Sequence, residues 1–148
     1  MTADSELPRW TRAAAYALAI DGAGRILLVR IAAGYPAAGR WTLPGGGLEF
    51  GEDPAAGALR ELVEETGLEG RITSLAFVDS RTGPARPEQG QGEWHGVHIV
   101  YRVEIVGGEL RDELDESTDV AAWVDRAGAR ALLLGHLGEA ALDYLDAE

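Results

Sequence analysis

Residues 45–68 read GGGLEFGEDPAAGALRELVEETGL. The second half of this stretch predicts a helix. Asp53 is a good N-cap, and Pro54 follows at the first helical position, where its missing N–H costs nothing. Gly67 is a typical C-terminal stop. Between these ends, small and apolar side chains fall on one side that we expect to pack on a core: Ala55, Ala58, Leu59, Leu62 and Thr66, with Val63 at its edge.

The opposite side of the predicted helix is acidic. Glu61, Glu64 and Glu65 are spaced i, i+3 and i+4, so their carboxylates converge on one face. Like charges at these spacings repel by roughly 0.2–0.5 kcal/mol per pair. A hard divalent cation such as Mg²⁺ would turn this repulsion into coordination, because it takes oxygen ligands. Arg60 precedes Glu64 by one helical turn and could hold its carboxylate in one rotamer.

A glycine-rich turn comes just before the helix. Gly45, Gly46 and Gly47 allow a sharp bend and bring the backbone close to a ligand. Glu49 and Glu52 add two carboxylates at the helix entry. We interpret the stretch as a loop–helix–loop that holds metal and phosphate together.

The same residues resemble the Nudix box, in which G and E are followed by R-E-U-x-E-E-x-G-U, with U apolar. The pattern falls on Gly46, Glu52, Arg60, Glu61, Leu62, Glu64, Glu65, Gly67 and Leu68, and no fixed position departs from it. The resemblance implies the α/β/α sandwich of Nudix domains with a mixed central sheet. It also implies hydrolysis of a phosphoanhydride bond in a nucleoside diphosphate linked to another moiety, with Mg²⁺ or Mn²⁺ as cofactor.

The resemblance further implies roles for the matching positions. Glu64 and Glu65 would be the principal metal ligands, and Glu61 would bind metal or serve the attacking water. The backbone near Gly46 would lie beside the metal, and Arg60 would orient the glutamates. Glu52 is treated as structural or as an outer partner.

A general base outside the box is common in this family, and its position varies. Asp115, Glu116 and Asp119, just before Trp123, are the candidates here. For any one of them, a solvated acidic loop is the more common situation. Glu116 is our single choice.

Substrate contacts have weaker signals. Arg40, Arg81 and Arg86 lie in expected loops that could face phosphate, although each is more often a surface residue. His95 and His98 could contact a nucleotide or transfer a proton, although a strand histidine is more often a satisfied sheet residue.

The chain has 148 residues and is expected to form one domain over residues 10–148, after a loose tail at 1–9. Its net charge of −12 argues against binding of nucleic acid polymers or anionic membranes. A small phosphorylated nucleotide remains compatible, because bound metal supplies local positive charge. There is no cysteine, no apolar run long enough to span a bilayer and no secretory leader pattern, so a cytoplasmic location is the default.

Periodicity and turn residues predict an α/β class with α+β features, a mixed sheet between helices. The expected strands are residues 12–20 and 25–30, forming a hairpin, then a short strand from 41, then 71–80, 94–106 and 120–125. The expected loops are 31–40, 81–93 and 107–119, and helices are expected at 126–134 and 137–147.

Other functions stay open at this point. A non-catalytic Nudix-like module that binds a nucleotide or another ligand is the main alternative, although the retained glutamates favour an enzyme. An isomerase-type relative acting on isoprenoid diphosphates would be expected to use a cysteine, which this chain lacks. A purely structural acidic domain is the remaining reading. The resemblance to the family also makes a homodimer an expectation.

Overall fold

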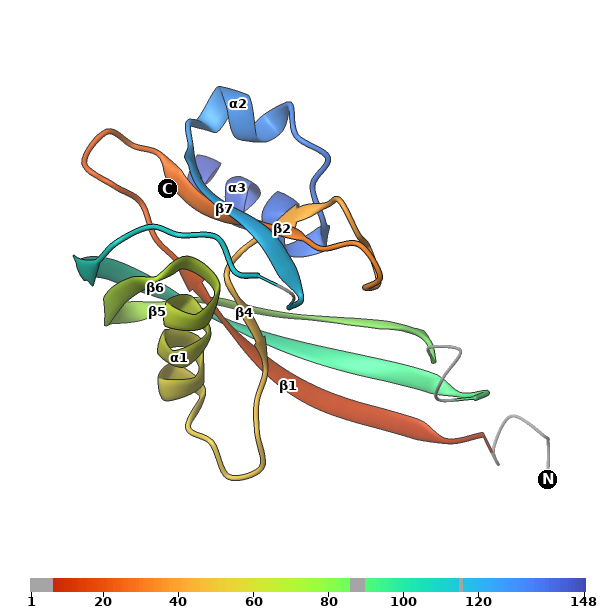
Figure 1. Ribbon diagram of the computed structural model, residues 1–148. Coiled ribbons are helices and arrows are strands. Elements are labelled where there is room, and N and C mark those ends of the chain that lie inside the picture. Colours follow the sequence, from red (N-terminus) through yellow and green to blue (C-terminus); the bar gives the residue numbers. More distant parts are fainter. Residues whose placement is uncertain (1–6, 86–89, 115) are drawn as a thin grey trace.

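A computed structural model describes residues 7–85, 90–114 and 116–148 (Figure 1). Its elements run in the order β1 (Arg9–Leu18), β2 (Ile26–Ile31), β3 (Trp41–Thr42), β4 (Gly45–Gly47), α1 (Pro54–Thr66), β5 (Leu68–Pro84), β6 (Glu93–Gly108), β7 (Thr118–Val124), α2 (Arg126–Arg130) and α3 (His136–Asp146). Within these ranges, no helix is long and apolar enough to cross a membrane.

The strands form two sheets. The larger has the order β4-β1-β6-β5, in which β1 runs parallel to β6 while the β4 and β5 pairings are antiparallel. The smaller has the order β3-β2-β7 and is antiparallel throughout. The mixed central sheet predicted for the fold class is confirmed, and the separate three-stranded sheet is an addition to that prediction.

The central part of the larger sheet is covered on both faces, because the inner residues of β1 and β6 alternate between two cores. Ala17 and Val103 pack with Leu62 of α1 on one face. Leu18 and Val100 pack on the other face with residues of β2, α2 and α3. Figure 1 shows α1 on one side of the sheet and β2, β7, α2 and α3 on the other. The site described below lies where α1 meets β4.

The predicted ends of the central helix are confirmed. The Asp53 side chain accepts a hydrogen bond from the Ala56 N–H at 3.0 Å, and Pro54 opens the helix. Gly67 ends it in the left-handed conformation, with φ of 77°, and its N–H donates to the Val63 carbonyl at 2.9 Å. Residues at the ends of the helix itself therefore determine where α1 begins and ends.

The predicted hairpin of residues 12–20 and 25–30 is wrong beyond its base. The contacts between the two segments are confined to the turn: an Ile20–Ile26 bridge and backbone hydrogen bonds from Leu27 to Ala19 and from Asp21 to Arg25. The reason is that both edges of β1 are already occupied by β4 and β6, so β2 pairs with β3 and β7 instead.

The predicted loop of residues 81–93 is too long. β5 continues to Pro84 and β6 begins at Glu93, in register with each other, which leaves 85–92 as the connection. The extra strand residues are largely exposed and show no apolar alternation, so no periodic pattern marks them as strand. These ends, with the start of β1, project beyond the helices (Figure 1).

The helix predicted at 126–134 ends earlier, at Arg130. The residues after it contact β3 instead. The Trp41 N–H donates to the Leu133 carbonyl, and Trp41 forms a β-bridge with Leu134.

Candidate functional site

The glycine turn and α1 are in direct contact. The Gly45 N–H donates a hydrogen bond of 2.7 Å to Oε1 of Glu65. A Cβ atom at Gly46 would lie 2.9 Å from Oε1 of Glu61, inside normal contact distance. A side chain at position 46 would require the Glu61 carboxylate to shift, so glycine lets the backbone of the turn approach that carboxylate closely.

Glu65 lies on the buried side of α1, whereas the sequence placed it on the acidic outer face with Glu61 and Glu64. Its residue is 3% exposed. It follows Ala58 by seven residues, about two helical turns, and so shares the core-facing direction of Ala58. Burial raises the pKa of the Glu65 carboxyl to about 9, and the negative charges of Glu61 and Glu113 add to this rise.

The three glutamates differ in exposure. Glu61 is partly buried, and burial raises the pKa of its carboxyl. The Glu64 side chain is 49% exposed and stands at the solvent edge of the group. The carboxylates thus run from the protein interior to the surface.

Arg60 holds the cluster from one side. Its guanidinium donates to both oxygens of Glu52, at 2.7 and 3.0 Å. It reaches Glu61 at 3.4 Å and both Glu64 oxygens at 3.3 Å. Glu64 was the partner expected from the sequence, but Glu52 is the closest one. These hydrogen bonds from Arg60 lower the pKa of the Glu52 carboxyl to about 2.

The donor set fits a hard divalent cation. Glu61, Glu64 and Glu65 offer carboxylate oxygens, the ligands that Mg²⁺ prefers. Glu65 has lost its hydration by burial and has one backbone N–H as its hydrogen-bond partner in the described chain. A nearby cation would offset that desolvation.

The acidic loop places its carboxylates in different surroundings. Glu116 is exposed and lines an open cavity of about 370 Å³ together with Tyr35 and Asp119. Asp119 is engaged elsewhere, because Arg30 donates to its two oxygens at 2.8 and 3.1 Å. Asp115 lies outside the described residues.

Glu113 is a carboxylate that the sequence did not single out. It accepts a hydrogen bond of 3.0 Å from the Thr118 hydroxyl, and burial raises the pKa of its carboxyl. Its negative charge in turn raises the pKa values of Glu61 and Glu65. No sequence motif marks this position, because the loop between β6 and β7 brings it to α1 from far along the chain.

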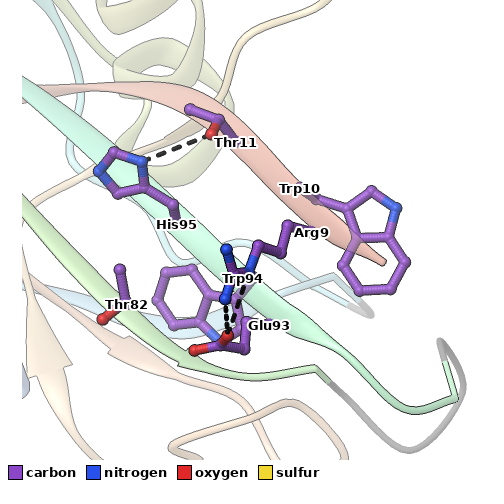
Figure 2. A pocket seen from close by; sticks show the side chains of 7 residues that line it. All are labelled: Arg9, Trp10, Thr11, Thr82, Glu93, Trp94 and His95. Atoms are coloured by element: carbon purple, nitrogen blue, oxygen red, sulfur yellow. Dashed lines mark hydrogen bonds and ion pairs between the residues drawn. The ribbon is translucent and has the colours of Figure 1, made fainter. Parts of the chain in front are cut away.

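Two residues that were predicted to contact substrate, Arg40 and His95, have other hydrogen-bond partners. Arg40 donates to the Leu134 carbonyl at 2.9 Å. His95 lies on the projecting end of β6, with its Nδ1 3.4 Å from the Thr11 hydroxyl (Figure 2). There it lines a cavity of about 290 Å³, with Trp10 and Trp94 among its neighbours. Arg86 lies outside the described residues.

His98 and its neighbours lie on the face of the sheet opposite α1. His98 is buried, and its Nδ1 is 2.8 Å from Oδ1 of Asp79. The Tyr16 ring meets it edge-on at 5.7 Å between centroids. Burial, followed by the charges of Glu65 and Glu61, raises the pKa of the Tyr16 hydroxyl to about 12.

Arg12 is a further cation that the sequence did not single out. It lies in β1, two residues before Ala14, which pairs with Gly47 of the glycine turn. A Cβ at Gly47 would overlap its guanidinium group. The exposed guanidinium thus packs directly over the turn, and it makes no ion pair with any described residue. A guanidinium in this position could contact a phosphate bound at the turn.

Comparison with known proteins gives a consistent family. A family model, that of the NUDIX domain, matches residues 10–142. An ADP-ribose pyrophosphatase of Methanocaldococcus jannaschii is 37% identical over 99 residues, which are 64% of this chain and 54% of that protein. A MutT-like protein of Streptomyces ambofaciens is 42% identical over 101 residues, 68% of this chain and 55% of that protein.

Solved structures agree with this assignment. The crystal structure of a MutT NUDIX hydrolase from Burkholderia pseudomallei superposes with a TM-score of 0.73 at 27% identity, covering 91% of this chain and 98% of that one. The chain spans about half the length of the curated relatives it matches.

Proposed function

Because the chain belongs to the NUDIX family, whose domain covers residues 10–142, we propose that it hydrolyses a phosphoanhydride bond of a nucleoside diphosphate linked to another moiety. Nucleoside triphosphates, ADP-ribose and nucleotide sugars are the proposed substrates. The observation that carries the proposal is the packing of Glu61 and the buried Glu65 against the glycine turn, with Glu64 at the solvent edge.

The proposed cofactor is Mg²⁺ or Mn²⁺, held by Glu61, Glu64 and Glu65 with the Gly46 backbone beside it. When bound, such a cation polarises phosphoryl oxygens and lowers the pKa of a water ligand. Arg60 keeps the carboxylates in place, because it is itself anchored by two hydrogen bonds to Glu52. This support fixes the ligand geometry before metal and substrate arrive.

We propose that the acidic loop supplies the general base that takes a proton from the attacking water. Glu116 is the choice from the sequence, whereas Glu113 is the candidate that its surroundings favour. Glu113 is supported by its electrostatic influence on Glu61 and Glu65. A base with a raised pKa can take a proton near neutral pH more effectively than an ordinary carboxylate.

Arg12 is proposed to contact the substrate phosphates, since its guanidinium lies over the glycine turn. A planar guanidinium matches the geometry of phosphate oxygens. Arg86, His95 and His98 stay weaker proposals for substrate contact. Arg40 is the weakest, because its guanidinium already serves the Leu134 carbonyl. The homodimer likewise stays a prediction.

The test is phosphate release from a panel of nucleotides with Mg²⁺ or Mn²⁺ present. The panel contains nucleoside triphosphates, ADP-ribose, nucleotide sugars and dinucleoside polyphosphates, coupled to either phosphatase or pyrophosphatase. Glu64→Gln is the test variant. Glu69→Gln is its matched control, because Glu69 is an exposed glutamate just beyond the helix.

Turnover by the wild type and Glu69→Gln, reduced at least about 100-fold in Glu64→Gln, would support the hydrolase. The coupling enzyme required would show which anhydride is cut. Equal turnover in Glu64→Gln would remove Glu64 from the site. Silence across the panel, with nucleotide-induced thermal shifts retained, would favour a binding module instead.

A further inference from the structure

Three potential metal ligands meet on the face of the larger sheet that is turned away from α1. Asp79 comes from β5, His98 from β6 and His136 is the first residue of α3. Nδ1 of His98 is 2.8 Å from one Asp79 oxygen, and Nε2 of His136 is 2.9 Å from the other. One ligand atom from each residue lies within 4.8 Å of those of the other two.

Strand pairing and a backbone hydrogen bond fix the positions of these three residues. Asp79 and His98 are paired in register across β5 and β6, so their side chains share one face. His136 follows Gly135, whose N–H donates to the Trp41 carbonyl at 2.9 Å. The start of α3 is therefore fixed to β3, and the three ligands need little rearrangement to converge.

Burial of the group is graded in a way that suits an open metal site. His98 is 9% exposed, while the side chains of Asp79 and His136 are 25% and 39% exposed. A cation bound by these three would be enclosed on the sheet side and open on the solvent side. Water could then supply a fourth ligand, as in tetrahedral sites with three protein ligands.

The ligand chemistry differs from that of the glutamate cluster. Two imidazole nitrogens and one carboxylate suit zinc and its neighbours in the transition series, whereas Mg²⁺ prefers oxygens alone. We propose that Asp79, His98 and His136 form a second metal site, for a zinc-class dication, which is distinct from the Glu61–Glu64–Glu65 cluster and does not depend on the hydrolase activity.

Such a site would fasten α3 to the sheet. Its ligands connect two strands of the larger sheet with the first residue of the last helix. A metal that binds the folded chain but not the unfolded one stabilises the fold, and the gain grows with the logarithm of the metal concentration relative to Kd. The site also adjoins Tyr16, whose ring meets that of His98. Burial raises the pKa of the Tyr16 hydroxyl, and the negative charges of Glu65, Glu61 and Asp79 add to this rise.

The alternative is that the two histidines simply donate hydrogen bonds to Asp79, which the same distances allow. Metal titration separates the two readings. The full chain is first saturated with excess Mg²⁺ to occupy the glutamate cluster. Zn²⁺ is then added in a calorimeter, and Co²⁺ is added in parallel because its visible absorption reports the ligand geometry.

The chain has three histidines, which provide a matched set of variants. His136→Ala is the main test variant, because the side chain is partly exposed and the fold should survive. His98→Gln is the second. His95→Ala is the control, since His95 is on the same strand but on the opposite face, beside Thr11. Glu64→Gln reports on the other cluster.

We expect one Zn²⁺ per chain in the wild type, in His95→Ala and in Glu64→Gln, with a raised melting temperature. His136→Ala and His98→Gln should weaken binding more than about 100-fold, because loss of even an outer partner of a metal site costs about 10–100-fold. Absence of Zn²⁺ binding by the wild type in Mg²⁺, or equal binding by His136→Ala and His95→Ala, would overturn the proposal.

Discussion

The buried carboxyl of Glu65 makes the stability of the metal-free protein depend on pH. Its pKa is about 9 in the folded chain, against an ordinary value of 4.5. Between these values the folded state binds more protons than the unfolded state, so the free energy of unfolding falls as the pH rises from about 4.5 to about 9. Bound Mg²⁺ should remove much of this loss, because it compensates the ionised carboxyl.

Glu65→Gln should therefore raise the melting temperature of the metal-free protein at alkaline pH, by about 2–4 °C for each kcal/mol regained. It should also abolish stabilisation by Mg²⁺. Thermal melts in EDTA and in Mg²⁺, across a pH series, measure both effects. Glu69→Gln is the control and should follow the wild type. A Glu65→Gln protein that melts below the wild type at every pH would contradict this expectation.

The roles of Glu113 and Glu116 can be distinguished by substituting each residue in turn. Glu113 accepts a hydrogen bond from Thr118, and its charge acts on Glu61 and Glu65, whereas Glu116 is exposed beside the Tyr35 cavity. We therefore expect Glu113→Gln to lower kcat by about 100-fold or more, the usual contribution of a general base. Glu116→Gln should lower it by less than about tenfold.

The pH profile of kcat/KM provides an independent check on this assignment. The limb that reports the base should disappear in the variant that has lost it. A larger loss of kcat in Glu116→Gln, with this limb removed, would return the role to the residue chosen from the sequence.

At the scale of elements, α1 could be predicted to the residue because its signals are local. The Asp53 cap, the Pro54 start and the Gly67 stop act within one helical turn of where they stand. The pairing of β1 could not be predicted in the same way. Its partner β6 lies far along the chain, and a run of small buried side chains does not specify which strand will adjoin it.

The C-terminus of α1 also supports the acidic loop. The Arg111 N–H donates to the Thr66 carbonyl at 2.9 Å, and its guanidinium reaches the Val63 carbonyl at 3.0 Å. Gly67 has a φ of 77°, and a Cβ there would lie 2.3 Å from the Glu109 carbonyl oxygen. An alanine at this position would both strain the helix end and displace the loop that carries Glu113.

Gly67→Ala should therefore destabilise the protein by more than strain alone. Gly51 is the matched control, because its φ is 78° but no atom lies within 4 Å of an added Cβ. Gly51→Ala should cost about 1–2 kcal/mol, the usual penalty for the left-handed conformation. Gly67→Ala should cost at least about 1 kcal/mol more, as seen in urea midpoints. Equal urea midpoints for the two variants would mean that the loop moves away from the added methyl group with no loss of stability.

At the scale of the molecule, the sequence could indicate the chemistry but not the full composition of the site. Glu61, Glu64 and Glu65 were predictable as a group because one helix carries all three. Glu65 was misplaced to the outer face, although its spacing from Ala58 puts it in the core-facing direction. Its hydrogen bond from the Gly45 N–H could not be predicted, because that bond depends on how α1 packs against β4. The Asp79–His98–His136 group had no signal at all. It exists because strand register and the docking of α3 bring together positions that are far apart in sequence.

The net charge of −12 adds a long-range contribution to metal binding that no single residue carries. A negative field attracts Mg²⁺ and repels an anionic nucleotide, and salt weakens both effects. Between about 0.01 M and 1 M ionic strength the Debye length falls from about 30 Å to about 3 Å. The Kd for Mg²⁺ should therefore rise about tenfold or more over this range, whereas the Kd for metal-free ADP-ribose should fall.

These opposite trends distinguish the field from direct competition by the salt cation. Tetramethylammonium chloride is the appropriate salt, because its bulky cation is a poor ligand for carboxylates. Calorimetric titration of Mg²⁺ into chelator-free protein, and of ADP-ribose into protein with EDTA, provides both constants. If both Kd values rose together, weakening by the salt would be general, and the acidic surface would have no part in drawing the cation to Glu61, Glu64 and Glu65.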